Sequence, residues 1–198
     1  MSIIADVDIV NMSLAEIGES PINSLDQNSS VARKVKAIYY LKRDELLRMH
    51  PWGFAKARVF LAKSVEKPVW GYSKYYLIPE DCLKILTIDV GEHPFHKEGR
   101  YIATDSDQAG LLYIFRVEDS NLFDASFKTL FSKYLSANLA WPIKGSRTLR
   151  SDLMNEFNRE LSLARGYSAT EGTPHSILEF DGDGIIAGSA GRGRISTY

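Results

Sequence analysis

Cysteine and histidine are scarce in this chain. Cys82 is the only cysteine among 198 residues, and there are four histidines. A single thiol excludes an internal disulfide and any zinc site built from several cysteines. Because a free cysteine usually packs as a small hydrophobe, we expect Cys82 to be a buried apolar residue and not a reactive thiol.

The chain also lacks an excess of one charge and a long apolar run. The formal net charge is −1, so overall basicity does not argue for binding to nucleic acid or to an anionic membrane. No apolar run approaches the roughly 20 residues that cross a bilayer. The N-terminus lacks the basic and apolar regions of a secretion signal. We therefore expect no membrane anchoring, and a protein made and used in a reducing cytoplasm or assembled there into something larger.

Sequence motifs for catalysis or metal binding are missing too. His93 and His96 lie close together, but Pro94 opposes a helix there and no further ligand completes a metal site. The segment Asp181–Gly184 begins like a calcium loop but lacks the later glycine and glutamate. Gly188–Arg194 is rich in glycine, yet no Lys-Ser or Lys-Thr follows as in a phosphate-binding loop. We expect no catalytic residue, metal or cofactor, although two distant carboxylates that meet in the fold would permit a hydrolase.

What the sequence does contain is apolar residues at helical spacing. Residues three and four apart line one face in four segments, which predicts helices there. Gly18, Pro51, Pro142 and Gly145 stand where glycine and proline end helices. Asp26 or Asn28 is expected to cap the second helix. The four predicted helices are Asp6–Ile17, Gln27–His50, Asn121–Trp141 and Ser146–Tyr167.

The second and third of these helices differ in how much apolar surface they carry. The third is apolar on more than one side, which predicts that it is the most buried helix. Trp52 and Phe54, which follow Pro51, are expected to bury an aromatic corner in the core. The second helix has basic residues on its other faces, and its apolar stripe consists of Val31, Val35, Ile38, Leu41, Leu46 and Met49.

Between the second and third helices the pattern changes to short strands. Clusters of β-branched and aromatic residues alternate with glycine and proline turn signals, which is typical of β-structure. We therefore expect a small β-sheet domain inserted into a helical one. The predicted strands are Arg58–Ala62, Lys74–Ile78, Leu83–Val90, Tyr101–Thr104 and Leu111–Arg116.

Together these elements predict an α+β fold, mainly a helical bundle of about four helices with an inserted small β-sheet domain and an extended C-terminal tail. The expected parts are 1–56 and 118–168 for the helical domain, 57–117 for the β-rich insert and 169–198 for the tail. The tail has too few apolar residues for a core of its own. We expect it to be disordered or ordered by a neighbour.

Two segments resemble a known family. The first runs from Ala15 to Leu25 and contains Ile-Gly-x-x-Pro-Ile; the second runs from Arg43 to Ala55 and contains Arg-Asp-x-Leu-Leu and Pro-Trp-x-Phe-Ala. In this order they are similar to the opening of tail tubular protein A, the head-to-tail adaptor of podophages. The similarity resumes over Phe123–Leu139 and Ser146–Arg165, so it covers the helical half of the chain.

The resemblance implies a structural protein and not an enzyme. Members of that family form a ring of twelve subunits between the portal protein and the tail nozzle of a virion. They provide an attachment surface for fibres or other tail parts, and DNA passes through the lumen without sequence-specific binding. On this basis we expect a virion protein of the neck or tail that is assembled in the host bacterial cytoplasm.

In such a ring, interface residues are exposed on the isolated subunit and buried in the assembly. We expect them on the basic side of the second helix, on the outer side of the fourth helix and in the tail. Two other functions stay open: a tail-associated cell-wall hydrolase, and a nucleic-acid binder that uses Arg192 and Arg194. The expected interface residues are Arg33, Lys36, Arg43, Arg147, Arg150, Asn158, Arg159, Ile177, Phe180, Ile185, Ile186, Arg192, Arg194 and Tyr198.

Overall fold

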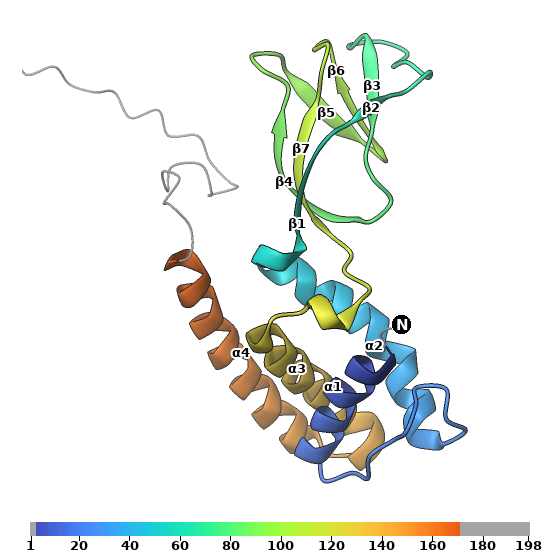
Figure 1. Ribbon diagram of the computed structural model, residues 1–198, viewed down its shortest axis with the longest axis vertical. Helices are drawn as coiled ribbons and strands as arrows, with labels where there is room; N and C mark the ends of the chain where they lie inside the picture. Colours follow the sequence, from blue (N-terminus) through green and yellow to red (C-terminus); the bar gives the residue numbers. More distant parts are fainter. Residues whose placement is uncertain (1–2, 171–198) are drawn as a thin grey trace, which may run out of the picture.

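The computed structural model describes residues 3–170, with side chains described for residues 6–166. Within this range the chain has an α+β fold, as expected, in which helices form one end of an elongated molecule and strands the other (Figure 1). The helices are α1 (Ile3–Glu16), α2 (Ser30–Met49), α3 (Ala125–Lys144) and α4 (Arg147–Thr170).

The start of α2 shows how local hydrogen bonds set a helix boundary. Ser29 is the N-cap, because its side-chain oxygen accepts a hydrogen bond from the backbone N–H of Ala32 at 3.1 Å. The prediction that Asp26 or Asn28 caps this helix was wrong. Asp26 instead forms an ion pair with Lys36, and Asn28 accepts a hydrogen bond from the Arg33 side chain.

The apolar face of α2 is rotated relative to the predicted stripe. Ala32, Val35 and Tyr39 are buried, whereas Leu41 is 59% exposed. Leu41 follows Tyr39 by two residues, so it lies on the opposite side of the helix. The prediction that Leu41 faces the core was therefore wrong.

Helix α3 continues through Pro142, which the sequence predicted to break it. Pro142 lies in the last turn of α3, where the missing N–H and the ring disturb only the end of the hydrogen-bond ladder. The helix ends at Gly145, whose φ of 66° is in the left-handed region and whose N–H bonds to the carbonyl of Trp141 at 2.9 Å. Glycine adopts this conformation without the steric cost that a Cβ brings.

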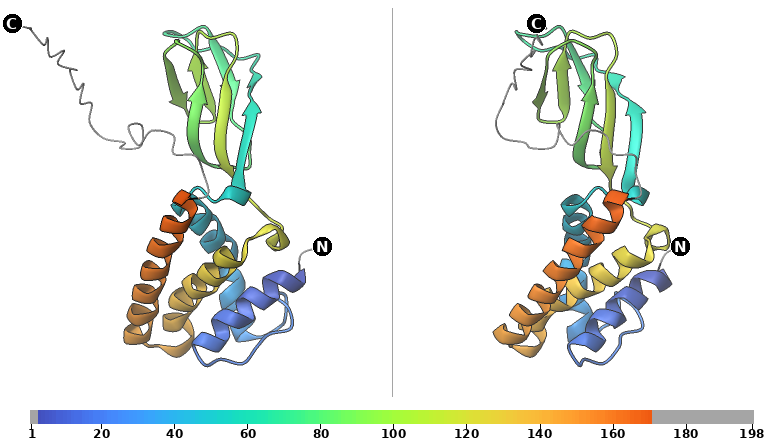
Figure 2. Two further views of the ribbon diagram at one scale, coloured as in Figure 1. Left: turned by 60° about the vertical axis from the view of Figure 1, so that its left-hand side comes forward. Right: turned by 90° about the vertical axis from the view of Figure 1, so that its left-hand side faces the viewer.

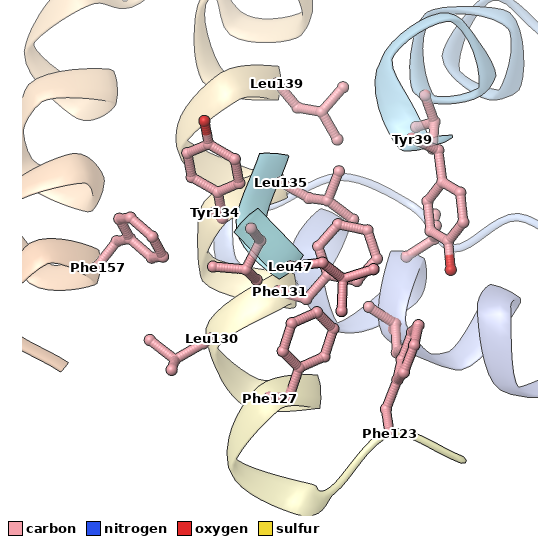
Figure 3. Close-up of a cluster of buried hydrophobic side chains, with 14 of the residues drawn as sticks. Tyr39, Leu47, Phe123, Phe127, Leu130, Phe131, Tyr134, Leu135, Leu139 and Phe157 are labelled. Atoms are coloured by element: carbon pink, nitrogen blue, oxygen red, sulfur yellow. The ribbon is translucent and has the colours of Figure 1, made fainter. Parts of the chain in front are cut away.

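The core of the helical end is built around α3, as predicted (Figure 3). Its aromatic side chains meet those of the other helices: Phe131 packs 5.1 Å from Tyr39 of α2, and Tyr134 packs 4.7 Å from Phe157 of α4, measured between ring centroids. Trp52 is buried and Phe54 half-buried against the same cluster, which confirms the predicted aromatic corner. Because α3 contacts α1, α2 and α4, it is the hub of the bundle.

The strands form two antiparallel sheets. One has the order β1-β7-β4 and the other the order β2-β3-β6-β5. Apolar residues from both sheets, including Tyr76, Ile102 and Tyr113, form a second core that is separate from the helical one. The strands are β1 (Lys56–Phe60), β2 (Ala62–Lys63), β3 (Lys74–Leu77), β4 (Cys82–Asp89), β5 (Phe95–Glu98), β6 (Tyr101–Thr104) and β7 (Gly110–Phe115).

Two features of the sheets differ from the prediction. The expected strand Arg58–Ala62 is divided at Leu61, whose N–H bonds to the carbonyl of Ala109 while the chain passes from one sheet to the other. The second difference is β5, which lies in a region read as a turn around His93–His96. All four residues of β5 are exposed, so no apolar alternation marks this edge strand in the sequence.

Side-chain contacts also join the helical end to the sheets, in addition to the two places where the backbone passes between them. Asp44 of α2 accepts a hydrogen bond from Nε of Arg116, just after β7, at 2.9 Å. The second oxygen of Asp44 pairs with Arg43 at 2.9 Å. Figure 2 shows the sheets stacked on the end of the bundle, so these contacts lie at the junction. No helix in the described range is long and apolar enough to cross a membrane.

Candidate assembly surfaces

The first candidate surface lies at the corner where α3 turns into α4. Trp141, near the end of α3, is 43% exposed although the sequence placed it in the most buried helix. The Arg147 guanidinium lies over its ring, 4.8 Å from the centroid. The tight turn at Gly145 brings the two residues together. We call this surface the corner platform; its hollow is lined by Trp141, Arg147, Arg150, Ser151, Met154 and Asn155.

The corner platform carries positive charge that has no counter-charge among residues 6–166. Arg147, Arg150 and Met154 are three to four residues apart, so they share one face of α4. Within residues 6–166, neither guanidinium forms an ion pair with a carboxylate. Arginine beside an aromatic ring and a methionine is typical of protein interfaces and suits carboxylates presented by a partner.

The corner is held rigidly to the rest of the bundle. Lys144 forms an ion pair with Glu19 at 2.9 Å, and its Nζ also donates to the carbonyl of Gly18 at 2.8 Å. On the other side, Nζ of Lys34 donates to the carbonyl of Pro142 at 2.7 Å. A partner that binds the platform would therefore meet a preformed surface.

The second candidate surface is the loop between β2 and β3, at the far end of the β-sheets (Figure 1). Val65 and Val69 are each 98% exposed and Trp70 is 83% exposed. Such large apolar residues are seldom left so exposed together unless a partner covers them. We call Val65, Val69 and Trp70 the β-tip.

The loop that carries the β-tip is held at its base by hydrogen bonds. The N–H of Ser64 donates to the carbonyl of Tyr75 at 2.8 Å, and the Tyr101 hydroxyl donates to Glu66 at 3.1 Å. Gly71 turns the chain with a φ of 90°, which a residue with a Cβ rarely adopts. These contacts close the loop while its apolar side chains point to solvent.

A third surface is an apolar hollow where the bundle meets the sheets. It is lined by Trp52, Phe54 and Leu130 from the core side and by the exposed Leu163 of α4. Its acidic residues are already engaged: Asp124 caps α3, and Glu160 pairs with Lys133 at 3.1 Å. The hollow is therefore mainly an apolar feature.

The structure places the predicted helical interface residues as follows. On α2, Arg33 and Lys36 are exposed, and both hold the loop before the helix through Asn28 and Asp26. On α4, Arg147, Arg150, Asn158 and Arg159 are exposed on the outer side, of which the first two belong to the corner platform.

Arg43 does not fit the expectation of an exposed basic residue. It is only 5% exposed, pairs with Asp44, and lies 5.4 Å from the ring centroid of Tyr40. A buried arginine with a fixed partner is a structural residue. The prediction that Arg43 is exposed in the isolated subunit was therefore wrong.

The predicted interface residues of the tail lie outside the described residues. The β-tip, in contrast, was missed by the sequence reading. A signal was present, since Pro68 and Gly71 mark a turn that contains a tryptophan. A loop has no periodic pattern from which exposure can be inferred, so these turn residues did not predict that the tryptophan is exposed. The tail residues concerned are Ile177, Phe180, Ile185, Ile186, Arg192, Arg194 and Tyr198.

Among residues 6–166, the carboxyl groups whose pKa departs from its ordinary value all have a lowered pKa. An acid catalyst needs a carboxyl with a raised pKa. The hydrogen bond from Lys133 instead lowers the pKa of Glu156. The pKa of Glu19 is likewise lowered by the hydrogen bond from Lys144. Within the described range, no three histidine, cysteine or acidic side chains gather where they would hold a metal ion.

Cys82 is half-buried at the start of β4, less enclosed than expected. Burial raises the pKa of its thiol, with the nearby Asp81 carboxylate acting in the same direction. Because the thiolate is the reactive form, these surroundings oppose a nucleophilic role.

Comparison with known proteins does not assign a family. No protein-family model matches the chain, and no curated protein is similar to it.

Proposed function

We propose that this chain is a structural head-to-tail adaptor of a short-tailed phage virion, one subunit of a ring between the portal protein and the tail nozzle. The observation that carries the proposal is the position of its exposed apolar residues. The β2–β3 loop, which carries the β-tip, and the turn between α3 and α4, which carries the corner platform, lie at opposite ends of an elongated body (Figure 2). Each carries a surface that a partner would cover.

Ring formation requires two unlike patches on every subunit. A heterologous contact joins one patch to a different patch on the next copy, and the ring closes when the rotation between copies divides a full turn. In this chain such contacts would lie along the sides of the subunit, whereas the corner platform and the β-tip at its two ends would bind the partners above and below the ring. Tryptophan, arginine and methionine, which occur on these surfaces, are enriched in protein interfaces.

The proposal also assigns the partners by their place in the particle. One face of the ring would contact the portal and the other the tail nozzle, with fibres or other tail parts attached outside. DNA would pass through the lumen without sequence-specific contacts. The chain would be assembled into the virion in the host bacterial cytoplasm, and the ring of twelve implied by the family resemblance sets the expected copy number.

Co-sedimentation with the portal protein of the same genome tests this proposal. The full chain should move with the portal ring on a density gradient. Because the portal contacts only one end of the chain in this proposal, either the variant with Arg147→Glu and Arg150→Glu or the variant with Trp70→Ser should move with it less, while the other should move with it normally. Leu41→Ser, which alters an exposed apolar residue elsewhere, is the matched control. Unchanged co-sedimentation of both surface variants would argue against these two surfaces, and no co-sedimentation of the natural chain would argue against the function.

A further inference from the structure

The corner platform has the properties of a docking site for an acidic, apolar peptide. Its two guanidinium groups have no carboxylate partner within residues 6–166, and Trp141 and Met154 add apolar surface beside them. A peptide that suits this surface carries several carboxylates, an aromatic or aliphatic side chain between them, and no basic residue.

One segment of the chain itself has this composition. Residues 177–183 read Ile-Leu-Glu-Phe-Asp-Gly-Asp, with carboxylates at Glu179, Asp181 and Asp183 and with Phe180 between them. The segment contains no lysine or arginine. It lies outside the described residues, so its composition and its distance along the chain carry the argument.

We propose that residues 177–183 bind the corner platform of the same chain. The carboxylates would pair with Arg147 and Arg150, and Phe180 would pack on Met154 beside the ring of Trp141. The contact joins opposite charges and removes apolar surface from water at the same site.

The length of the connecting chain permits this contact within one molecule. Phe180 follows Thr170, the last residue of α4, by ten residues, which span up to ~35 Å when extended. Met154 lies sixteen residues before Thr170, or ~24 Å back along the helix. The segment therefore reaches the platform with length to spare.

Tethering also favours the same chain over a second copy. A short connection gives an effective concentration in the ~mM range, which a separate chain matches only when its own concentration is that high. In dilute solution the platform is therefore occupied by its own tail. This contact does not depend on the proposed function.

Its consequence does rest on the proposed function. A partner that binds the corner platform must first displace residues 177–183. Free chains would then keep this surface covered, and a partner with higher affinity, such as the portal ring, would expose it. The tail contact thereby opposes association before the partner is present.

Disulfide trapping in the full chain tests the contact without any partner protein. In a Cys82→Ser background, one cysteine is placed on the platform by Ser151→Cys and one in the tail by Gly182→Cys. The matched control replaces the first cysteine by Asp152→Cys, an exposed position at the same height on another side of α4. The rate of intramolecular disulfide formation is measured in a fixed glutathione buffer.

The platform pair should close about tenfold faster than the control pair, as expected for two exposed arginine–carboxylate pairs and one aromatic contact. Arg147→Glu with Arg150→Glu should reduce the rate to that of the control. Adding Glu179→Lys, Asp181→Lys and Asp183→Lys should restore it, since the charges are then complementary again. Restoration separates a specific contact from a fold disturbed by substitution.

Two results would overturn the inference. Equal rates for the platform and control pairs, unaffected by charge reversal, would show that the tail does not bind there. Rapid disulfide-linked dimers from a mixture of Ser151→Cys chains and Gly182→Cys chains would show that the tail binds a second copy. Neither result involves the portal, so failure here is distinguishable from failure of the adaptor proposal.

Discussion

Asp44 has a larger structural role than a single surface carboxylate usually has. It pairs with the buried Arg43 of its own helix and with Arg116 at the end of β7, so it links the helical core to the sheets. Its side chain is only 21% exposed. Removing it would leave Arg43 buried without a counter-charge, which is more costly than losing an exposed pair.

We predict that Asp44→Ala lowers the free energy of unfolding by about 3 kcal/mol, because it leaves a buried charge unpaired. Arg116→Ala, which removes only the more exposed partner, should lower it by less than about 1 kcal/mol. Urea denaturation followed by tryptophan fluorescence gives both values. Equal effects of the two substitutions would mean that Arg43 does not depend on Asp44.

The ion pair between Lys133 and Glu156 predicts a pH dependence. The hydrogen bond from Lys133 lowers the pKa of Glu156 in the folded chain. A carboxyl with a lowered folded-state pKa stabilises the fold above its unfolded pKa, and this stabilisation is lost as the pH falls through the folded value. The pair is half-exposed at Glu156, so its contribution is small.

Glu156→Gln should therefore destabilise the chain by about 0.5 kcal/mol at neutral pH and by less in acid, where Glu156 becomes protonated in the folded chain as well. The difference in unfolding free energy between the two chains, measured across this range, checks the sign. Asp152→Asn, an exposed change on the same helix, is the control. A difference that persists undiminished in acid would contradict the electrostatic explanation.

At the level of elements, apolar spacing predicted the helices well because each helix buries one face against α3. Buried residues such as Val35 and Leu46 occupy predicted positions. The spacing did not show which of two adjacent stripes of α2 faces the core, and Leu41 was misplaced. That choice is made by the partner helix, which a single sequence does not display.

Strand prediction failed where burial gave no pattern. β5 is exposed at every residue, and β2 has two residues, so neither shows alternation between buried and exposed positions. Prediction of the candidate surfaces likewise succeeded only where a periodic pattern exists. Arg147 and Arg150 were predicted from their helical face, whereas Trp70 lies in a loop, where no period predicts exposure.

The β2–β3 loop makes a prediction that separates stability from binding. Val65→Ser, Val69→Ser and Trp70→Ser together should leave the free energy of unfolding within about 0.5 kcal/mol, because these side chains are almost fully exposed. The same triple variant should bind its partner at least about tenfold more weakly, as expected for an exposed aromatic anchor.

Binding of the triple variant to the portal, or to the nozzle protein when the portal does not contact this end, is measured by surface plasmon resonance. Leu122→Ser is the matched control, since Leu122 is also an exposed apolar residue but lies near the junction. A large loss of stability would show that the β-tip packs within the chain. Normal affinity for both partners would remove the β-tip as an interface.

At the scale of the whole molecule, the proposed adaptor role depends on an elongated subunit with unlike surfaces at its two ends. The junction contacts around Asp44 hold these ends together, and in the proposed adaptor the platform and the β-tip would bind the partners. Such a subunit suits a ring that must bind one partner above and another below. The proposed role is therefore assembly, which the mass of the assembled complex reports.

Native mass spectrometry of the full chain mixed with the portal protein of the same genome tests that claim most directly. The account predicts a single complex whose mass equals the portal ring plus a complete ring of this chain, with twelve copies expected from the family resemblance. The mass thereby also determines the copy number. A portal ring that stays free of this chain, under conditions where the portal itself is fully assembled, would contradict the adaptor function.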